Sequence, residues 1–298
     1  MTFKEALSRA RQALLAGGID NAPLEGELLL RHTLKISRVQ LYQDFEHEFD
    51  PRQEESLWQL VRRRLKGEPV AYITGYREFY GLDFCVNPSV LIPRPESELL
   101  VEKALSLAQN YKQPIIADIG TGCGAIAISL ALNLPQAKLY ATDISAPALE
   151  VAQLNCQKHG VADRIHLLCG DMLEPLPEPV DFIVANLPYV KQSEIDAGGF
   201  EPDLALNGGK DGLEKIQKLC HQVGGKLQPG GCLLLEIGQG QKRAVTSLLR
   251  RLFPSAEIEV TRDLASIDRM VSLVTSEKTD LIEEGNSNGH YCLRQAGY

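Results

Sequence analysis

The feature that most constrains the fold is a regular alternation of strand and helix patterns from residue 115 onward. Short apolar runs predict strands at residues 115–119, 138–142, 165–168, 182–185 and 232–237, near residue 258, and at 270–274. Helical patterns are found at residues 125–134, 147–158, 213–227 and 245–252. Strands and helices that alternate in this way form a doubly wound, mainly parallel sheet, so an α/β protein is expected.

The first 71 residues carry a purely helical pattern instead. Apolar residues recur at helical spacing from Phe3 to Leu14, stop at Gly17, and recur over residues 24–34 and after Pro51. Residues 72–92 are rich in aromatic residues and glycine, which predicts a β-hairpin that links two domains. We therefore expect a small helical domain at 1–71, the hairpin at 72–92, the α/β domain at 93–275 and a flexible tail at 276–298.

Composition and charge exclude several classes of protein. A net charge of -8 and a pI near 5.4 argue against direct nucleic-acid binding, which needs a concentrated basic field. The chain has no run of eighteen apolar residues, and Glu5 stands where a signal peptide would carry bases, so a cytoplasmic protein without membrane contact is expected. Seven cysteines without a Cys-x-x-Cys pair or a histidine cluster predict reduced thiols and no metal site. The basic run at residues 62–66 is a candidate contact for an acidic partner, but a solvated helix face explains it better.

A glycine loop follows the first predicted strand of the α/β domain. It comprises Gly120, Thr121, Gly122, Cys123 and Gly124, and it enters a predicted helix. Glycines at this place let backbone N–H groups approach a bound ligand closely. The spacing fits a dinucleotide-binding loop and a methyltransferase loop equally well, and a tight strand-to-helix turn is the plain alternative.

Three further residues are candidates for binding the adenosine part of a cofactor. Asp143 ends the next strand, where a carboxylate can accept hydrogen bonds from both ribose hydroxyls. Asp171 could take an adenine amino group, and Met172 offers a polarizable surface to its ring. Asp143 could instead cap the following helix, and Asp171 with Met172 could be a turn beside the core.

The tetrad Asn186, Leu187, Pro188 and Tyr189 separates these readings. It follows the strand at 182–185, so it should lie at the carboxyl edge of the sheet and face the glycine loop. A nicotinamide enzyme has no need for Asn-x-Pro-Tyr at this edge. Methyl transfer to a planar nitrogen, in contrast, requires groups that hold and orient that nitrogen, and the tetrad can supply them.

An amide nitrogen is a poor nucleophile because its lone pair is conjugated with the carbonyl, as the barrier of ~18–20 kcal/mol to rotation of a peptide bond reflects. The side-chain oxygen of Asn186 and the backbone carbonyl of Leu187 can accept its two N–H bonds. These acceptors hold the nitrogen toward a sulfonium methyl and stabilise the positive charge that develops. Pro188 restricts the turn, and Tyr189 can pack on the plane of the acceptor.

At these residues the chain resembles the release-factor glutamine methyltransferases, the PrmC/HemK family. The resemblance covers the chain to about residue 274. The segments at 79–84 and 91–98 are more specific to this family than the glycine loop and the tetrad, which many amino-methyltransferases share. Its carriers are residues 68–75, 79–84, 91–98, 118–127, 186–189, 201–202, 205–206, 212–213, 236–238, 241, 262–263 and 268–269.

The resemblance implies a class I methyltransferase domain that uses S-adenosylmethionine, and a helical N-terminal domain that helps dock a peptide-chain release factor. The implied acceptor is the glutamine of a Gly-Gly-Gln motif, bound by the tetrad, and Asn186 is also implied in cofactor binding. The family usually has Asn-Pro-Pro-Tyr, whereas Leu187 replaces the first proline here. The tetrad also resembles that of rRNA adenine dimethyltransferases, so a nucleic-acid amino-methyltransferase stays an alternative. A nucleotide-binding dehydrogenase and a non-catalytic binding module are the others.

Overall fold

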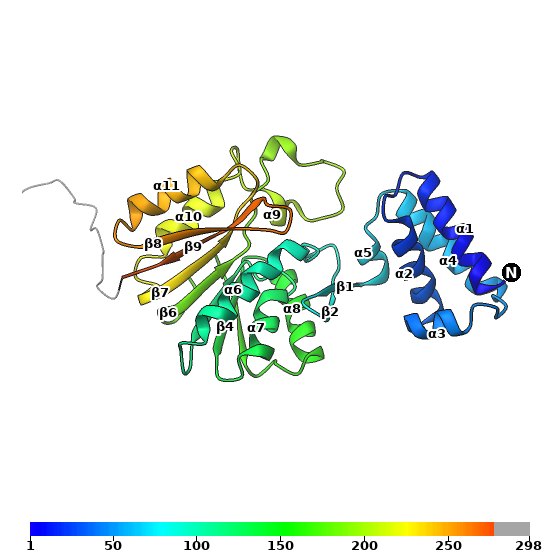
Figure 1. The fold of residues 1–298 in the computed structure, drawn as a ribbon, viewed down its shortest axis with the longest axis horizontal. Coiled ribbons are helices and arrows are strands. Elements are labelled where there is room, and N and C mark those ends of the chain that lie inside the picture. The colour runs from blue at the N-terminus through cyan, green and yellow to red at the C-terminus, as the bar shows by residue number, and fades with distance from the viewer. Residues whose placement is uncertain (277–298) are drawn as a thin grey trace, which may run out of the picture.

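A helical bundle forms the N-terminal part of the computed structural model, which describes residues 1–276 (Figure 1). Its helices are α1 (Phe3–Ala16), α2 (Ala22–Leu34), α3 (Arg38–Gln43) and α4 (Pro51–Leu65). Capping boxes at Thr2, Ser37 and Asp50 start α1, α3 and α4 by satisfying free backbone N–H groups. The short helix α3 was not predicted, because its six residues are too few to show a period.

Two arginines of the basic run of α4 form ion pairs with glutamates of this chain. Arg63 contacts Glu68 through two hydrogen bonds of 2.7 and 2.5 Å, and Arg64 contacts Glu25 at 2.5 Å. Arg62 is exposed. The run therefore does not present one continuous basic surface.

The segment between the bundle and the sheet differs from the predicted hairpin at its start. Helix α5 (Val70–Thr74) holds Tyr72, and only then do β1 (Tyr76–Phe79) and β2 (Leu82–Cys85) form an antiparallel hairpin. The expectation of extended chain from residue 72 was wrong at this point. The aromatic ring of Tyr72 is buried, and its hydroxyl donates to the Val90 carbonyl at 2.6 Å. Its side chain therefore has a packing role on a helix rather than in a strand.

The predicted doubly wound sheet is present, and the described residues 1–276 form seven strands of it in the order β5-β4-β3-β6-β7-β9-β8. The first five strands of this order are parallel, and β9 runs antiparallel to both of its neighbours. The strands are β3 (Ile115–Ile119), β4 (Lys138–Asp143), β5 (Ile165–Cys169), β6 (Val180–Ala185), β7 (Leu227–Glu236), β8 (Glu257–Arg262) and β9 (Asp268–Val274).

Helices cover both faces of the sheet. They are α6 (Glu98–Ala108), α7 (Ala125–Asn133), α8 (Ala146–Lys158), α10 (Glu214–Gln222) and α11 (Lys242–Leu252). The 3₁₀ turn η1 (Pro95–Ser97) precedes α6, and the 3₁₀ turn η2 (Gln192–Glu194) and the short helix α9 (Asp203–Leu206) lie in the segment between β6 and α10. The predicted helix at 213–227 was too long, because α10 ends before Gly225, whose φ of 81° no helix continues through. The chain then enters β7 five residues earlier than predicted.

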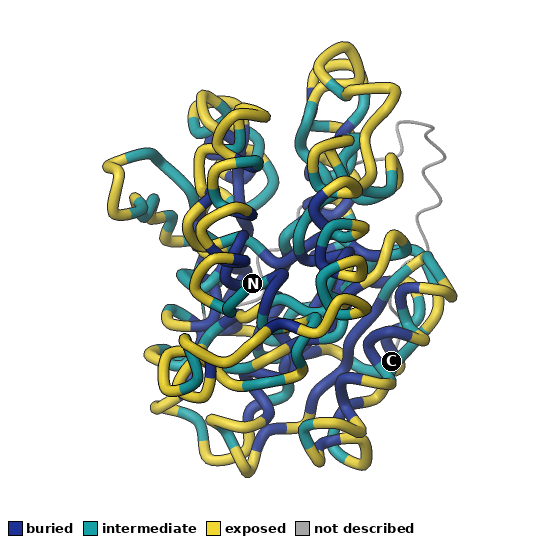
Figure 2. The backbone as a smooth tube through the Cα atoms, turned by 90° about the vertical axis from the view of Figure 1, so that its right-hand side faces the viewer, coloured by how far each residue is buried: buried dark blue, intermediate teal, exposed yellow. Residues whose placement is uncertain are grey.

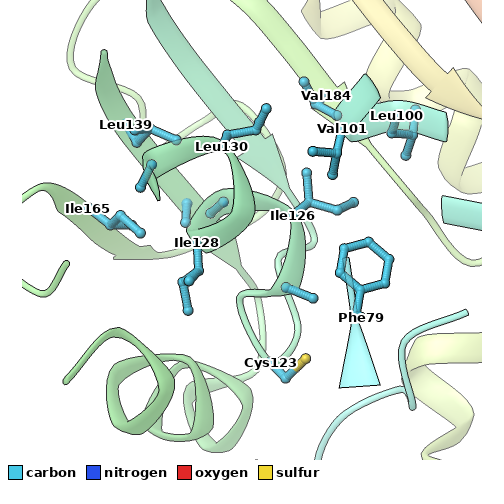
Figure 3. Packing of buried hydrophobic residues seen from close by; sticks show 14 of the residues in the cluster. Phe79, Leu100, Val101, Cys123, Ile126, Ile128, Leu130, Leu139, Ile165 and Val184 are labelled. Carbon is cyan, nitrogen blue, oxygen red and sulfur yellow. The ribbon is translucent and has the colours of Figure 1, made fainter. Parts of the chain in front are cut away.

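Two hydrophobic cores lie on the two faces of the sheet, and buried backbone concentrates along the central strands (Figure 2). The core under α6, α7 and α8 also takes in the hairpin. Phe79 of β1 lies near Ile126 and Cys123 at the start of α7 (Figure 3). A third core is confined largely to the bundle. The hairpin is therefore anchored to the sheet domain by packing as well as by chain connection.

The direction of chain progression reverses between β3 and β6, since β4 and β5 extend the sheet one way and β7 the other. Ligands of open α/β sheets bind at such a point, beyond the carboxyl ends of the strands. Within residues 1–276 no helix is long and apolar enough to cross a membrane. The predicted tail at 276–298 lies outside the described residues except for Ser276.

Candidate active site

A cavity opens at the carboxyl ends of β3, β4 and β6. Its empty volume is about 930 Å³, with solvent at the mouth included. The predicted residues that line it are Gly120, Gly122, Asp143, Asp171, Met172, Asn186, Leu187 and Pro188. The structure thus brings both halves of the predicted site together around one space.

The glycine loop borders this cavity through Gly120 and Gly122, whose φ angles are 71° and 55°. A Cβ at Gly120 would lie 3.3 Å from Cδ2 of Leu187, so a side chain there meets both backbone strain and the tetrad. Thr121, Cys123 and Gly124 are not among the lining residues. They are buried and hold the loop in place rather than bordering the cavity.

Asp118, at the penultimate position of β3, had no predicted role. Its Oδ2 accepts from Thr121 Oγ1 at 2.7 Å and from the Ala127 N–H at 3.2 Å. Burial raises the pKa of this carboxyl to about 7, against the effect of these two bonds. Asp118 therefore ties the loop to the start of α7.

Asp143 links the cavity to the glycine loop. Its Oδ2 accepts from the Gly122 N–H and its Oδ1 from the Ser145 N–H, both at 2.9 Å. Ser145, not Asp143, caps α8 by accepting from the Ala148 N–H. Each carboxylate oxygen keeps a further lone pair, so Asp143 can still accept two hydroxyl bonds from a ligand.

Asp171 and Met172 lie at the far wall of the cavity, after β5. The Asp171 carboxylate is paired with the Lys218 ammonium group. Met172 has a φ of 54°, and its carbonyl accepts from Thr142 Oγ1 at 2.9 Å. The Asp171 carboxylate therefore already has a charged partner within the protein.

The Asn186 to Tyr189 turn stands opposite the glycines. Asn186 Nδ2 donates to Ser97 Oγ at 2.8 Å, which leaves the amide oxygen Oδ1 as its acceptor. Leu187 is buried and packs into the core below the turn. Tyr189 does not line the cavity; its hydroxyl donates to Glu236 Oε1 at 3.1 Å. Burial and the nearby Glu236 carboxylate raise the pKa of Tyr189.

The loop between β6 and α10 also borders the cavity, and no role was predicted for it. Pro202, Leu204 and Ala205 of this loop line the cavity. Glu201 anchors it by accepting from the Ile92 N–H at 3.1 Å and by pairing with Arg94. Glu201 and Arg94 lie in segments that carried the family resemblance, whereas no signal pointed to Leu204.

Comparison with known proteins decides the family. Residues 5–75 match the PrmC N-terminal domain, and residues 95–199 match the methyltransferase small domain. Over 274 residues the chain is 44% identical to the release factor glutamine methyltransferase of Moorella thermoacetica. The aligned region covers 90% of this chain and 97% of that protein. The chain belongs to the release factor glutamine methyltransferase family.

A second member of this release factor glutamine methyltransferase family, from Bordetella pertussis, is 43% identical over 253 residues and covers 83% of this chain and 93% of its own length. The solved structure of a methyltransferase from Pyrococcus furiosus matches 66% of this chain and 90% of that chain, with 19% identity and a TM-score of 0.50. That match shows a shared fold. The family resemblance predicted from the sequence is confirmed, and with it S-adenosylmethionine as the cofactor.

Proposed function

We propose that this chain transfers a methyl group from S-adenosylmethionine to the side-chain amide nitrogen, N5, of the glutamine in the Gly-Gly-Gln motif of peptide-chain release factors. Its membership in the release factor glutamine methyltransferase family supports this acceptor. The observation that carries the proposal is the Asn186 amide, which lines the same cavity as Gly120 and Gly122 and has its Nδ2 held by Ser97. Because release factors act in translation, a cytoplasmic location is part of the proposal.

The cavity residues fit the cofactor. S-adenosylmethionine supplies an electrophilic methyl on a sulfonium sulfur. Asp143 has spare acceptor sites for ribose hydroxyls, and charge-assisted bonds of this kind contribute about 1.5–3 kcal/mol each. The backbone at Gly120 and Gly122 allows close approach of a ligand, since neither residue carries a Cβ. Asp171, Met172 and Asn186 complete the proposed cofactor set.

The acceptor amide is bound by the tetrad. Asn186 Oδ1 and the Leu187 carbonyl accept its two N–H groups, so the nitrogen is held with its face toward the cofactor. With the cofactor bound, both oxygens would stabilise the positive charge that the nitrogen gains as its bond to the methyl carbon forms and the bond from that carbon to sulfur breaks. Loss of one N–H proton to solvent would then give the neutral methylated amide. Losing one such preorganised partner costs about 2.7–4 kcal/mol. Alignment of the two reactants contributes up to ~7–11 kcal/mol in favourable cases.

The second candidate acceptor is the exocyclic amine of adenine, which could use the same turn. The net charge of -8 favours a protein acceptor, because a nucleic acid must be held by a basic field. Direct nucleic-acid binding is therefore not part of the proposal.

Labelled S-adenosylmethionine tests the choice of acceptor. The chain is incubated in parallel with a release factor, with rRNA and with duplex DNA. We expect label on the release factor alone. Label on either nucleic acid and none on the release factor would overturn the proposal in favour of the adenine acceptor.

A further inference from the structure

Two buried side chains behind the tetrad connect it to distant elements. Asn186 Nδ2 donates to Ser97 Oγ at 2.8 Å, and Ser97 Oγ donates to Glu236 Oε2 at 2.6 Å. Ser97 and Glu236 are 3% and 2% exposed, and neither lines the cavity. Ser97 ends η1 and Glu236 ends β7, so three separate parts of the chain meet in one line of hydrogen bonds.

The chemistry of these groups fixes the direction of the hydrogen bonds. An ionised carboxylate only accepts, so the single hydroxyl proton of Ser97 is committed to Glu236. The lone pairs of Ser97 Oγ then face Asn186, and only the NH₂ end of that amide can donate to them. Through Ser97, Glu236 thereby fixes the orientation of the Asn186 amide. The NH₂ end faces Ser97, and the oxygen Oδ1 faces away from it.

Two neighbours reinforce the same arrangement. Tyr189 donates to the second oxygen of Glu236 at 3.1 Å, so the same carboxylate contacts Tyr189 directly and Asn186 through Ser97. Burial raises the pKa of Glu236, while the bonds from Ser97 and Tyr189 and the charge of Arg269 oppose that shift. The two hydrogen-bond donors and the Arg269 charge favour the ionised form of this carboxylate, whereas the charge of Glu96 raises its pKa further.

We propose that Ser97 and Glu236 are positioning residues that aim the Asn186 amide oxygen at the acceptor amide. The inference rests on the proposed function, in which Asn186 must accept an N–H. A reversed Asn186 would present its own N–H groups to those of the acceptor, and donor would face donor. Donation toward a Ser97 backed by a negative charge also increases the electron density on Asn186 Oδ1, because linked hydrogen bonds polarise one another.

A matched pair of variants separates this role from simple satisfaction of buried polar groups. Ser97→Thr and Ser97→Val introduce side chains of nearly the same shape as each other, and only threonine keeps the hydroxyl. We expect Ser97→Val to lower kcat by roughly ten- to hundredfold relative to Ser97→Thr, as loss of an orienting partner does elsewhere. The KM for S-adenosylmethionine should stay within about threefold in both, because packing is matched.

The Asn186→Ala background gives the decisive control. If Ser97 acts through Asn186, Ser97→Val should cost less than about threefold once Asn186 is gone, since residues that act as a unit are not additive. An equal loss in both backgrounds would overturn the positioning role. So would a Ser97→Val enzyme whose kcat is within twofold of Ser97→Thr.

The unmodified chain is assayed first, so that the two proposals fail separately. If it places no methyl on a release-factor glutamine, the proposed function is wrong. Should both Ser97 variants lose cofactor binding, Glu236→Gln decides, because it keeps the shape and removes the charge. A kcat lowered roughly ten- to hundredfold with unchanged cofactor affinity supports the role, and an unchanged kcat overturns it.

Discussion

Asn155 donates from Nδ2 to the Cys123 carbonyl at 2.9 Å and thereby joins helix α8 to the glycine loop. The same side chain donates to the Cys85 carbonyl at 3.0 Å and accepts from the Cys85 N–H at 2.7 Å. Asn155 is fully buried. One amide therefore holds the end of the hairpin and the loop that borders the cavity in a fixed relation.

Replacing this amide should destabilise the fold. Asn155→Ala leaves one buried backbone group, the Cys123 carbonyl, and two part-buried groups of Cys85 without this partner. An unpaired buried group costs about 1–3 kcal/mol. We expect the free energy of unfolding, measured by urea denaturation, to fall by at least about 2 kcal/mol. The exposed Gln157 lies on the same helix, and Gln157→Ala is the matched control, with an expected change below ~0.5 kcal/mol. Equal effects of the two changes would contradict this role.

Asp118 should make stability depend on pH. Burial raises its pKa from 3.8 to about 7, so between these values the folded chain binds a proton that the unfolded chain does not. Its contribution to the free energy of unfolding therefore decreases as pH rises through that window, by at most about 1.4 kcal/mol per pH unit. Asp118→Asn removes this titration. The stability of the variant relative to the native chain should rise from pH 4 to pH 7, and a constant difference would refute the assignment.

Asp143 should control cofactor affinity. Asp143→Ala removes the proposed ribose acceptors and the partners of the Gly122 and Ser145 N–H groups. We expect the Kd for S-adenosylmethionine, measured by calorimetry, to rise at least about tenfold, which corresponds to ~1.4 kcal/mol. Asp163 is exposed and lies away from the cavity lining, so Asp163→Ala should leave the Kd unchanged. An unaltered Kd in Asp143→Ala would remove this residue from the site.

Leu187 should tolerate the proline that the family usually carries. The proposed role of residue 187 uses its backbone carbonyl, which proline shares, although the packing of the leucine side chain is lost. Leu187→Pro is expected to keep methyl transfer to a release factor within about tenfold. A hundredfold loss in a variant that still folds would mean that the leucine side chain takes part.

The parts of this molecule that follow from local patterns were predictable. The apolar run of β3, the glycine loop after it and the tetrad after β6 each lie within one segment, and the rule for parallel sheets brings them to one edge. Helix α5 was missed because its one aromatic and three β-branched residues suit a strand equally well in sequence. The alternative role of Asp143, as the cap of α8, is excluded because Ser145 caps that helix.

The residues that support the site were not predictable, because they come from elements far apart in the chain. Ser97, Glu201 and Glu236 belong to segments that carried the family resemblance, yet no pattern in the sequence relates one to another. Only the sheet order brings β7 beside β6 and so places Glu236 behind the tetrad. The division of the chain at residues 71, 92 and 275 stays a prediction, as do the individual roles of the site residues.

The central claim is that Asn186 presents an amide nitrogen to the methyl group of the cofactor. Mass spectrometry of a release-factor fragment, after incubation with the chain and S-adenosylmethionine, tests it most directly. The account predicts one added methyl group on the glutamine of Gly-Gly-Gln, and methylation slowed by roughly 10²- to 10³-fold with Asn186→Ala that still binds the cofactor. A methyl group on another residue, or full methylation by Asn186→Ala, would contradict it.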